Sequence, residues 1–347
     1  MTIAAPAAAS ADATTPDTPP ADPGARPGRH PAHSLLTLTG GLAAVLVALL
    51  ALFILPSLKS GPRDLPLGLV GTADAVTAAQ AGLDQLAPGD YTTRSLASED
   101  DLVDAVRDRD VVGGLVVTPD GVRAVVASAG STAISGTLSA TAGGVAASLG
   151  LPVEVTDVVP LPADDPTGIG VGGLAFPLVF GGIVPVVAFG TAFAGRHRWR
   201  LTGILGFSAV GGTVVAAVLQ LWFGSVTSVF VPVAGAMALG IAALALPLAG
   251  LQQLLGTKGF TAGAMVMMFL GNPLAGIATT GAWLPAGLGA FGQLLPPGAT
   301  GALVRSVAYF DGAGALAPLA TLTAWALVGA GLNALAVRRT RRGATEA

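Results

Sequence analysis

The sequence predicts a polytopic α-helical membrane protein with six transmembrane helices and an extracytoplasmic α/β domain between the first and second helices. Hydrophobic residues make up 52% of the 347 residues and charged residues only 11%, with a mean hydropathy of +0.72. Such a composition is typical of membrane proteins. Between residues 201 and 304 the only charge is Lys258, and so long an uncharged stretch must contain several membrane spans.

The uneven distribution of charge predicts the separate domain. Residues 57–167 hold fifteen acidic residues against six basic ones, although the net charge of the whole chain is only −3. This segment is therefore soluble in character, and its acidity argues against a nucleic-acid partner. The chain has no cysteine, which excludes disulfides, thiolate nucleophiles and cysteine-based metal sites.

The N-terminal elements are a tail and one membrane anchor. Residues 1–34 are rich in Ala, Pro, Thr and Asp without apolar periodicity, which predicts a disordered cytoplasmic tail. Residues 35–55 are apolar or small, enough for about 32 Å of helix, and form the first predicted transmembrane helix. A signal peptide is the alternative, but the apolar run is long and no A-x-A-like cleavage site follows it.

Residues 57–167 alternate between valine-rich runs and helical patterns, which predicts a small α/β domain. Ser98 and Asp101 have capping-box spacing, and Asp120 with Gly121 indicates a hairpin turn. The acidic cluster at residues 99–101 is interpreted as a helix start in preference to a cation site. We expect strands at residues 65–71, 91–96, 111–118, 121–128 and 152–159, and helices at residues 73–86, 99–109 and 132–149.

Residues 168–337 are predicted to form a five-helix membrane domain. Asn272 and Pro273 should end or kink the fifth span, because proline removes a backbone donor and restricts the residue before it. Residues 278–314 are apolar but interrupted by prolines and glycines, which predicts a re-entrant or interfacial segment of short helices. Small residues such as Ser208 and Gly212 favour close helix approach. The expected spans are residues 169–194, 201–223, 229–251, 259–277 and 315–337.

The basic residues predict the orientation in the cell membrane. Threading the six spans back and forth places Arg196, Arg198, Arg200 and Lys258 on one side, together with the basic tail at residues 338–347. The acidic domain falls on the other side. The positive-inside rule then makes the basic side and both termini cytoplasmic.

Motifs for chemistry are missing from the sequence. It contains no G-x-x-x-x-G-K-[ST], G-x-S-x-G or H-E-x-x-H pattern, so we expect no enzyme activity, no cofactor and no metal site in this chain. His30 and His33 in the tail lack a third ligand. No ionisable residue lies at the middle of a predicted span, which makes a secondary transporter the least favoured class.

Four polar or restricted positions remain as structural or translocation-related candidates beside Asn272 and Pro273. Arg305 and Asp311 are interpreted as a structural ion pair in preference to a substrate contact. Asp165 before Pro166 has the order of an N-cap followed by proline at the first helical position, so this pair should start the second span.

Three segments carry a resemblance to a known family: "DVVPLPADDPTGIG" at residues 157–170, "GNPLAG" at residues 271–276, and "LPAGLGAFGQLLPPGATGALVRSVAYFDG" at residues 284–312. With the layout of the spans, residues 35–340 resemble the ABC-2-type exporter permeases, and more closely their YhgE/Pip (phage infection protein)-like branch in actinobacteria.

The resemblance implies the permease subunit of an ABC-type exporter, a homo- or heterodimer in the lipid bilayer that moves a hydrophobic or amphipathic cargo outward. A separate ATP-binding subunit would drive it and dock on the cytoplasmic face, where Arg196, Arg198, Arg200 and Lys258 are the candidate contacts. These permeases usually have a substantial coupling helix after the second span, whereas this loop spans only about residues 195–200. The alternative is a non-transporting membrane anchor or receptor whose external domain binds a cell-surface or secretion-assembly partner.

Overall fold

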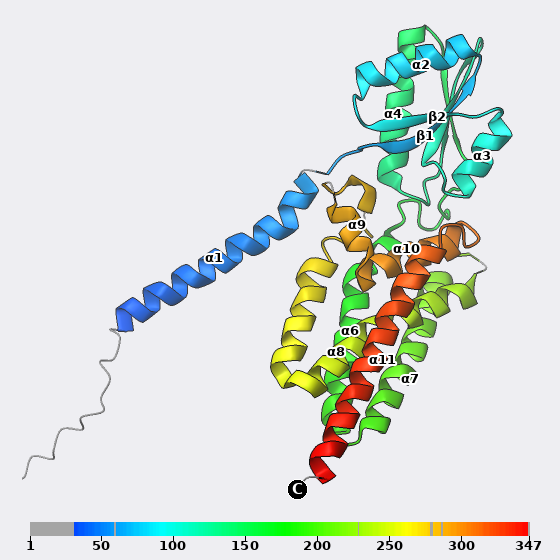
Figure 1. Ribbon diagram of the computed structural model, residues 1–347. Coiled ribbons are helices and arrows are strands. Elements are labelled where there is room, and N and C mark those ends of the chain that lie inside the picture. The colour runs from blue at the N-terminus through cyan, green and yellow to red at the C-terminus, as the bar shows by residue number, and fades with distance from the viewer. Residues whose placement is uncertain (1–30, 59, 228, 278–279, 286, 346–347) are drawn as a thin grey trace, which may run out of the picture. The chain divides into compact units, whose positions relative to one another are not determined.

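A computed structural model describes residues 31–345 apart from residues 59, 228, 278–279 and 286 (Figure 1). The predicted disordered tail lies outside the described residues up to residue 30. Residues 31–34, which were expected in that tail, belong instead to the first turn of a helix. Residues Leu49–Ala347 form one compact unit, which contains an α/β domain and a helical domain.

The first predicted span lies in helix α1 (Pro31–Leu58). Its leucines, such as Leu36 and Leu42, are strongly exposed. A continuous apolar surface of this kind is suited to an apolar environment rather than to water. Its shorter apolar stretch, Leu35–Ala51, leaves α1 outside the four helices of the described chain that are long and apolar enough to cross a membrane. Those four helices indicate a membrane protein.

The α/β domain has the predicted order of elements. Strands β2, β1, β3, β4 and β5 form one sheet in that spatial order, with β3 and β4 antiparallel and the other neighbours parallel. Thr118 pairs with Gly121, so Gly121 opens β4 instead of lying in the turn. The bounds are β1 (Leu65–Gly71), α2 (Ala73–Leu86), β2 (Tyr91–Ser95), α3 (Glu99–Arg107), β3 (Gly113–Thr118), β4 (Gly121–Val126), α4 (Thr132–Leu149) and β5 (Val153–Asp157).

Helices cover the two faces of the sheet. On one face α2 and α4 pack over Leu69 and Leu115, with Leu138 of α4 fully buried. On the other face α3 contributes Leu102, and Phe310 joins the same cluster from the far end of the chain. Because side chains alternate along a strand, the central strands bury both of their faces. The second core is therefore completed by a residue of the helical domain.

The predicted capping box starts α3. Ser98 Oγ accepts a hydrogen bond from Asp101 N–H at 3.1 Å and donates to the Asp101 carboxylate at 2.8 Å. Glu99 of α3 pairs with Arg123 of β4 at 2.7 Å. The acidic cluster therefore caps the helix, as its local sequence predicts, and also forms an ion pair that the sequence analysis did not predict.

The helical domain consists of three long helical passages, α11, and a series of short helices. Helix α11 continues past the predicted span, so the predicted basic tail is helical to Thr345. The bounds are α5 (Ile169–Gly172), α6 (Ala175–Ala192), α7 (His197–Ala217) with η1 (Val218–Trp222), α8 (Phe230–Val266) with η2 (Met267–Gly271), η3 (Gly281–Trp283), α9 (Leu288–Gln293), α10 (Pro296–Tyr309) and α11 (Leu316–Thr345).

Helix α8 reverses at Gly256, which has φ 66° and ψ −154°. This backbone region is essentially restricted to glycine. A Cβ added at Gly263 would lie 2.8 Å from Leu248 Cδ2. In a straight helix these two residues would be about 22 Å apart along the axis. The passage is therefore a hairpin of two limbs, which correspond to the predicted third and fourth membrane helices after the α/β domain.

The second limb of this hairpin is shorter than predicted. Regular helical structure ends at Gly271, and Asn272 is the C-cap of η2, as the following proline predicts. The limb of residues 257–271 is about 22 Å long at 1.5 Å per residue, less than the 30 Å hydrocarbon core of a bilayer. The predicted span at residues 259–277 is therefore wrong in its C-terminal part.

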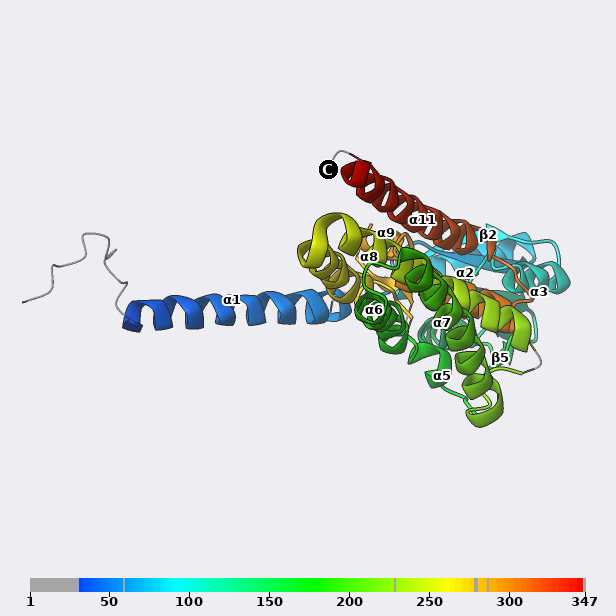
Figure 2. The same ribbon diagram turned by 90° about the horizontal axis from the view of Figure 1, so that it is seen from below.

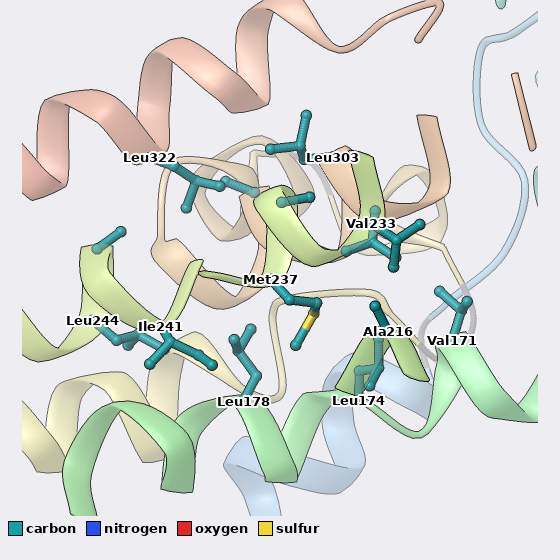
Figure 3. Packing of buried hydrophobic residues seen from close by; sticks show 14 of the residues in the cluster. Val171, Leu174, Leu178, Ala216, Val233, Met237, Ile241, Leu244, Leu303 and Leu322 are labelled. Carbon is teal, nitrogen blue, oxygen red and sulfur yellow. The ribbon is translucent and has the colours of Figure 1, made fainter. Parts of the chain in front are cut away.

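The first limb of α8 is the centre of the helical domain. Figure 2 shows α8 between α11 and α6, and Figure 3 shows Met237 and Ile241 beside Leu178 of α6. Leu322 of α11 belongs to the same buried cluster. Residues 241–250 are all buried. A Cβ at Gly212 of α7 would lie 2.5 Å from the backbone of α8, which confirms the close approach predicted from the small residues.

We predict that Gly212→Ala destabilises the protein by about 1–3 kcal/mol, because the added methyl meets backbone atoms that cannot turn away. Gly206→Ala, on the same helix, is the matched control because no atom lies within 4 Å of its Cβ position. It should be neutral or stabilising by up to about 1 kcal/mol. Thermal unfolding in lipid nanodiscs measures both, and equal effects of the two variants would contradict the packing.

Candidate functional site

The α/β domain and the helical domain meet at the end of α10. Prolines at residues 296 and 297 occupy the first helical positions, where their missing N–H groups cost nothing. At the other end, Phe310 is only 6% exposed and packs into the second core of the α/β domain. Tyr309 packs against both that core and the core of the helical domain. We call the contact of Ser306, Tyr309 and Phe310 with the α/β domain the seam.

Arg109 holds the seam from the side of the α/β domain. It follows α3 with φ 65°, a left-handed backbone conformation that is uncommon for arginine. Its Nη1 donates to Ser306 Oγ at 2.6 Å, and its guanidinium carbon lies 5.0 Å from the centre of the Phe310 ring, a cation–π distance. Partial burial lowers the pKa of Arg109, but an arginine remains charged at neutral pH.

Arg305 lies one position before Ser306 on α10. Its Nη2 donates to the carbonyl oxygen of Ile277 at 2.9 Å. The predicted ion pair with Asp311 is wrong: Asp311 is exposed and lies beyond the helix end with φ 50°. Six helical residues also turn through about 600°, which places the two positions on different faces. Burial, and then the charge of Arg109, lower the pKa of Arg305.

Arg109 and Arg305 line the same cavity, which has a volume of about 360 Å³. Thr280 and Gln293 add polar groups, and the Gln293 carboxamide donates to the carbonyl of Ala275 at 3.0 Å. Within the described part of the chain, no carboxylate lies within 4.0 Å of either guanidinium. The remaining wall is largely glycine and small apolar residues: Gly130, Ala275, Gly276, Ile277, Gly281, Ala282, Gly289, Ala290, Gly301 and Ala302.

The start of α4 adds to the positive character of this region. Gly130, just before the helix, lines both the large cavity and a neighbouring one of about 170 Å³, and Ser131 lines the smaller one. Arg109 and Thr280 line both cavities as well. Helix α4 is 18 residues long, and the N-terminus of a helix carries partial positive charge. Two guanidinium groups and a helix N-terminus therefore lie around one region, and the described residues that line its two cavities include no acid.

Asp165 lies close enough to Tyr309 of the seam for its charge to raise the pKa of that phenol. Its two carboxylate oxygens accept hydrogen bonds from the N–H groups of Ile169 and Gly170, each at 2.8 Å. The predicted cap is confirmed in its chemistry but wrong in its position, because Gly168 is the N-cap residue of α5. Pro166 lies in the turn before the helix and not at its first position. Gly168 has a left-handed backbone conformation, and the chain turns there so that the Asp165 carboxylate lies at the first N–H groups of α5.

The environment of Asp165 favours its charged form. Burial alone would raise the pKa of this carboxyl, which is 8% exposed. Ser225 and the N–H groups at the start of α5 outweigh burial and lower the pKa overall. The Ser225 hydroxyl is close to the carboxylate without meeting full hydrogen-bond geometry. The Tyr309 hydroxyl donates to the carbonyl of Ser225 at 2.8 Å. The cluster of Asp165 and Ser225 therefore also helps to hold Tyr309 in the seam.

The candidate contacts for an ATPase lie far from the seam, near the start of α7 and the start of the second limb of α8. Arg196, Arg198 and Lys258 are exposed, as predicted. Arg200 is 8% exposed and donates to the side chain of Gln252 and to a backbone carbonyl of α8, so it is a structural residue and the prediction of a surface contact is wrong. Helix α7 with η1 runs 26 residues, about 39 Å, from this basic end to the neighbourhood of Ser225.

The remaining predicted positions, Asn272 and Pro273, are half-buried behind the start of α10. A Cβ at the preceding Gly271 would lie 3.0 Å from the ring of Pro297. The structure thus places them near α10 but not in the arginine-lined cavity. Sequence reasoning missed Arg109 as a site residue, because its surroundings, "RDRD" at residues 107–110, are typical of a solvated surface.

Comparison with known proteins adds no assignment: no protein-family model, curated protein or solved structure matches this chain.

We predict that Asp165→Ala lowers the free energy of unfolding by about 0.5–2 kcal/mol at pH 7. A carboxyl with a depressed folded-state pKa stabilises the protein above its unfolded pKa of about 3.9 and loses that effect as the pH falls through the folded value. The deficit of the variant should therefore become smaller as the pH falls below the unfolded pKa. Asp164→Ala, at the exposed neighbour, is the control and should change little. Chemical unfolding between pH 3 and 7 tests this, and a pH-independent deficit would contradict it.

Proposed function

We propose that this chain is the membrane-spanning permease subunit of an ABC-type exporter that moves a hydrophobic or amphipathic cargo outward. The observation that supports it most is the seam, since α10 joins the glycine-packed centre of the helical domain to the α/β domain. Thr300 of α10 packs on Gly240 of α8, and Phe310 enters the α/β core. Such a connection suits a subunit in which movement of membrane helices changes the exposure of a site next to the α/β domain.

The proposed topology has six spans with both termini cytoplasmic in the cell membrane and the α/β domain outside. It is supported by the position of the basic residues: Arg200 contacts Gln252, and Gln253 contacts Asn333 of α11. The starts of α7 and of the second limb of α8 and the basic end of α11 therefore gather at one end. Single cysteines in this cysteine-free chain test the topology: an impermeant reagent added to cells should label Thr92→Cys and not Arg198→Cys.

Energy would come from a separate ATP-binding subunit at the basic end. The connection between α6 and α7 consists only of residues 193–196. Of the four candidate contacts, Arg196, Arg198 and Lys258 are exposed. A homo- or heterodimer is part of this proposal, since exporters of this type work in pairs. The short connection predicts a smaller ATPase contact than in permeases with a full coupling helix.

We predict that the purified chain associates with an ATPase encoded beside its gene and stimulates ATP hydrolysis. Arg198→Glu combined with Lys258→Glu should weaken association about fivefold or more. The two substitutions remove the attraction between these basic side chains and acidic groups of the ATPase and replace it with repulsion. Arg94→Glu, exposed on the α/β domain, is the control and should leave association unchanged. If no such ATPase associates or responds, the permease proposal fails, and a receptor whose α/β domain binds an external partner becomes the better account.

A further inference from the structure

The charge balance around the 360 Å³ cavity is the opposite of that in the rest of the α/β domain. Residues 57–167 hold fifteen acidic side chains, yet in the described structure none forms an ion pair with Arg109 or Arg305. Arginine has five N–H donors, and each of these two side chains uses one in a hydrogen bond to the protein. Two partly desolvated cations therefore line the cavity, each with one hydrogen bond from its guanidinium group to the protein.

Keeping two cations close together without an acid is unfavourable for the protein itself. The charge of Arg109 lowers the pKa of Arg305, so the two guanidinium groups repel each other. An anion between them would remove this repulsion and form charge-assisted hydrogen bonds, which are about twice as strong as neutral ones. Arginine is also the side chain whose planar fork matches phosphate and carboxylate.

An apolar surface adjoins this polar cavity. Helix α9 contributes Gly289, Ala290 and Gln293 to the cavity wall. Leu288 at the start of the helix, Phe291 within it and Leu294 just after it are exposed large hydrophobic side chains. One short helix thus has a face toward the arginine-lined space and another apolar face outside it. A ligand with an anionic head and an apolar tail would satisfy both.

The size of the cavity limits what it can hold. Ligand pockets are about 300–1,000 Å³, and 360 Å³ is at the small end of that range. The space fits a head group but not a long acyl chain, which would lie along α9. Much of the wall is glycine backbone, so few side chains would need to move.

We propose that Arg109 and Arg305 bind the phosphate or carboxylate head of an acidic amphiphile, whose apolar part lies against α9. Identifying this amphiphile as the exported cargo rests on the proposed function, whereas binding at this site does not. The guanidinium groups supply charge and hydrogen bonds, Thr280 and Gln293 supply further polar contacts, and the seam fixes the distance between the two arginines.

The test uses the full-length chain in a nonionic detergent without any ATPase, so that its result is independent of export. The acidic probe is dioctanoyl phosphatidic acid, the neutral probe is dioctanoylglycerol, and inorganic phosphate represents the head alone. Isothermal titration calorimetry should give saturable binding of phosphatidic acid, at least about 10-fold tighter than either other probe, because both parts of the ligand contribute. Raising the salt concentration should weaken the binding of phosphatidic acid and of inorganic phosphate, but not that of dioctanoylglycerol.

Arg109→Gln and Arg305→Gln should each weaken binding of phosphatidic acid about 10-fold or more. Arg107→Gln is the matched control, an exposed arginine two residues from Arg109, and should stay within about twofold. Arg305→Lys keeps the charge but loses the fork, so its affinity should fall between those of the wild type and Arg305→Gln. This variant keeps the test valid if the glutamine variant unfolds.

Three results would overturn the proposal. Equal affinity for dioctanoylglycerol would show that the charge has no role. Unchanged affinity in both glutamine variants would place any binding elsewhere. Inorganic phosphate binding as tightly as phosphatidic acid would make this a site for a soluble anion and not for an amphiphile.

Discussion

The burial of Phe310 in the α/β domain is the interaction on which the arrangement of the other parts depends. Among the described helices, α2 and α4 cover one face of the sheet and α3 covers the other, and Phe310 fills space beside α3 in the second core. An aromatic side chain buried in a core contributes several kcal/mol, about 3–5 by truncation. The end of α10 is therefore fixed against the sheet. Arg109 and Arg305 are held close to each other as a consequence.

The helical domain transmits this constraint because its centre is tightly packed. Helix α8 approaches its neighbours at glycines, where backbones meet without intervening side chains, and Thr300 of α10 packs on one of them, Gly240. The reversal at Gly256 returns the chain to the seam side, where η3, α9 and α10 follow. A displacement of α8 would therefore shift α10 and, through Phe310, the α/β domain.

Local signals explain which elements could be predicted from the sequence. Helices at residues 73–86 and 132–149 begin and end as expected, because Thr72 and Ser131 cap their starts and left-handed Gly150 ends the second. Long-range contacts explain the misses. Arg109 meets Ser306 across 197 positions, and Arg200 turns inward to Gln252, and neither contact leaves a local pattern. Of the two arginines in the cavity, the sequence singled out only Arg305, with the wrong partner.

The central claim is that the seam joins the two domains into one body. In this cysteine-free chain, spin labels at Asp84→Cys on α2 and Ala320→Cys on α11 would report the distance between the domains by double electron–electron resonance in nanodiscs. We expect a single narrow distribution, which broadens when Phe310→Ala is added and stays narrow with Phe180→Ala, an exposed phenylalanine on α6. A distribution that is broad without any seam variant, or unchanged by Phe310→Ala, would contradict the claim.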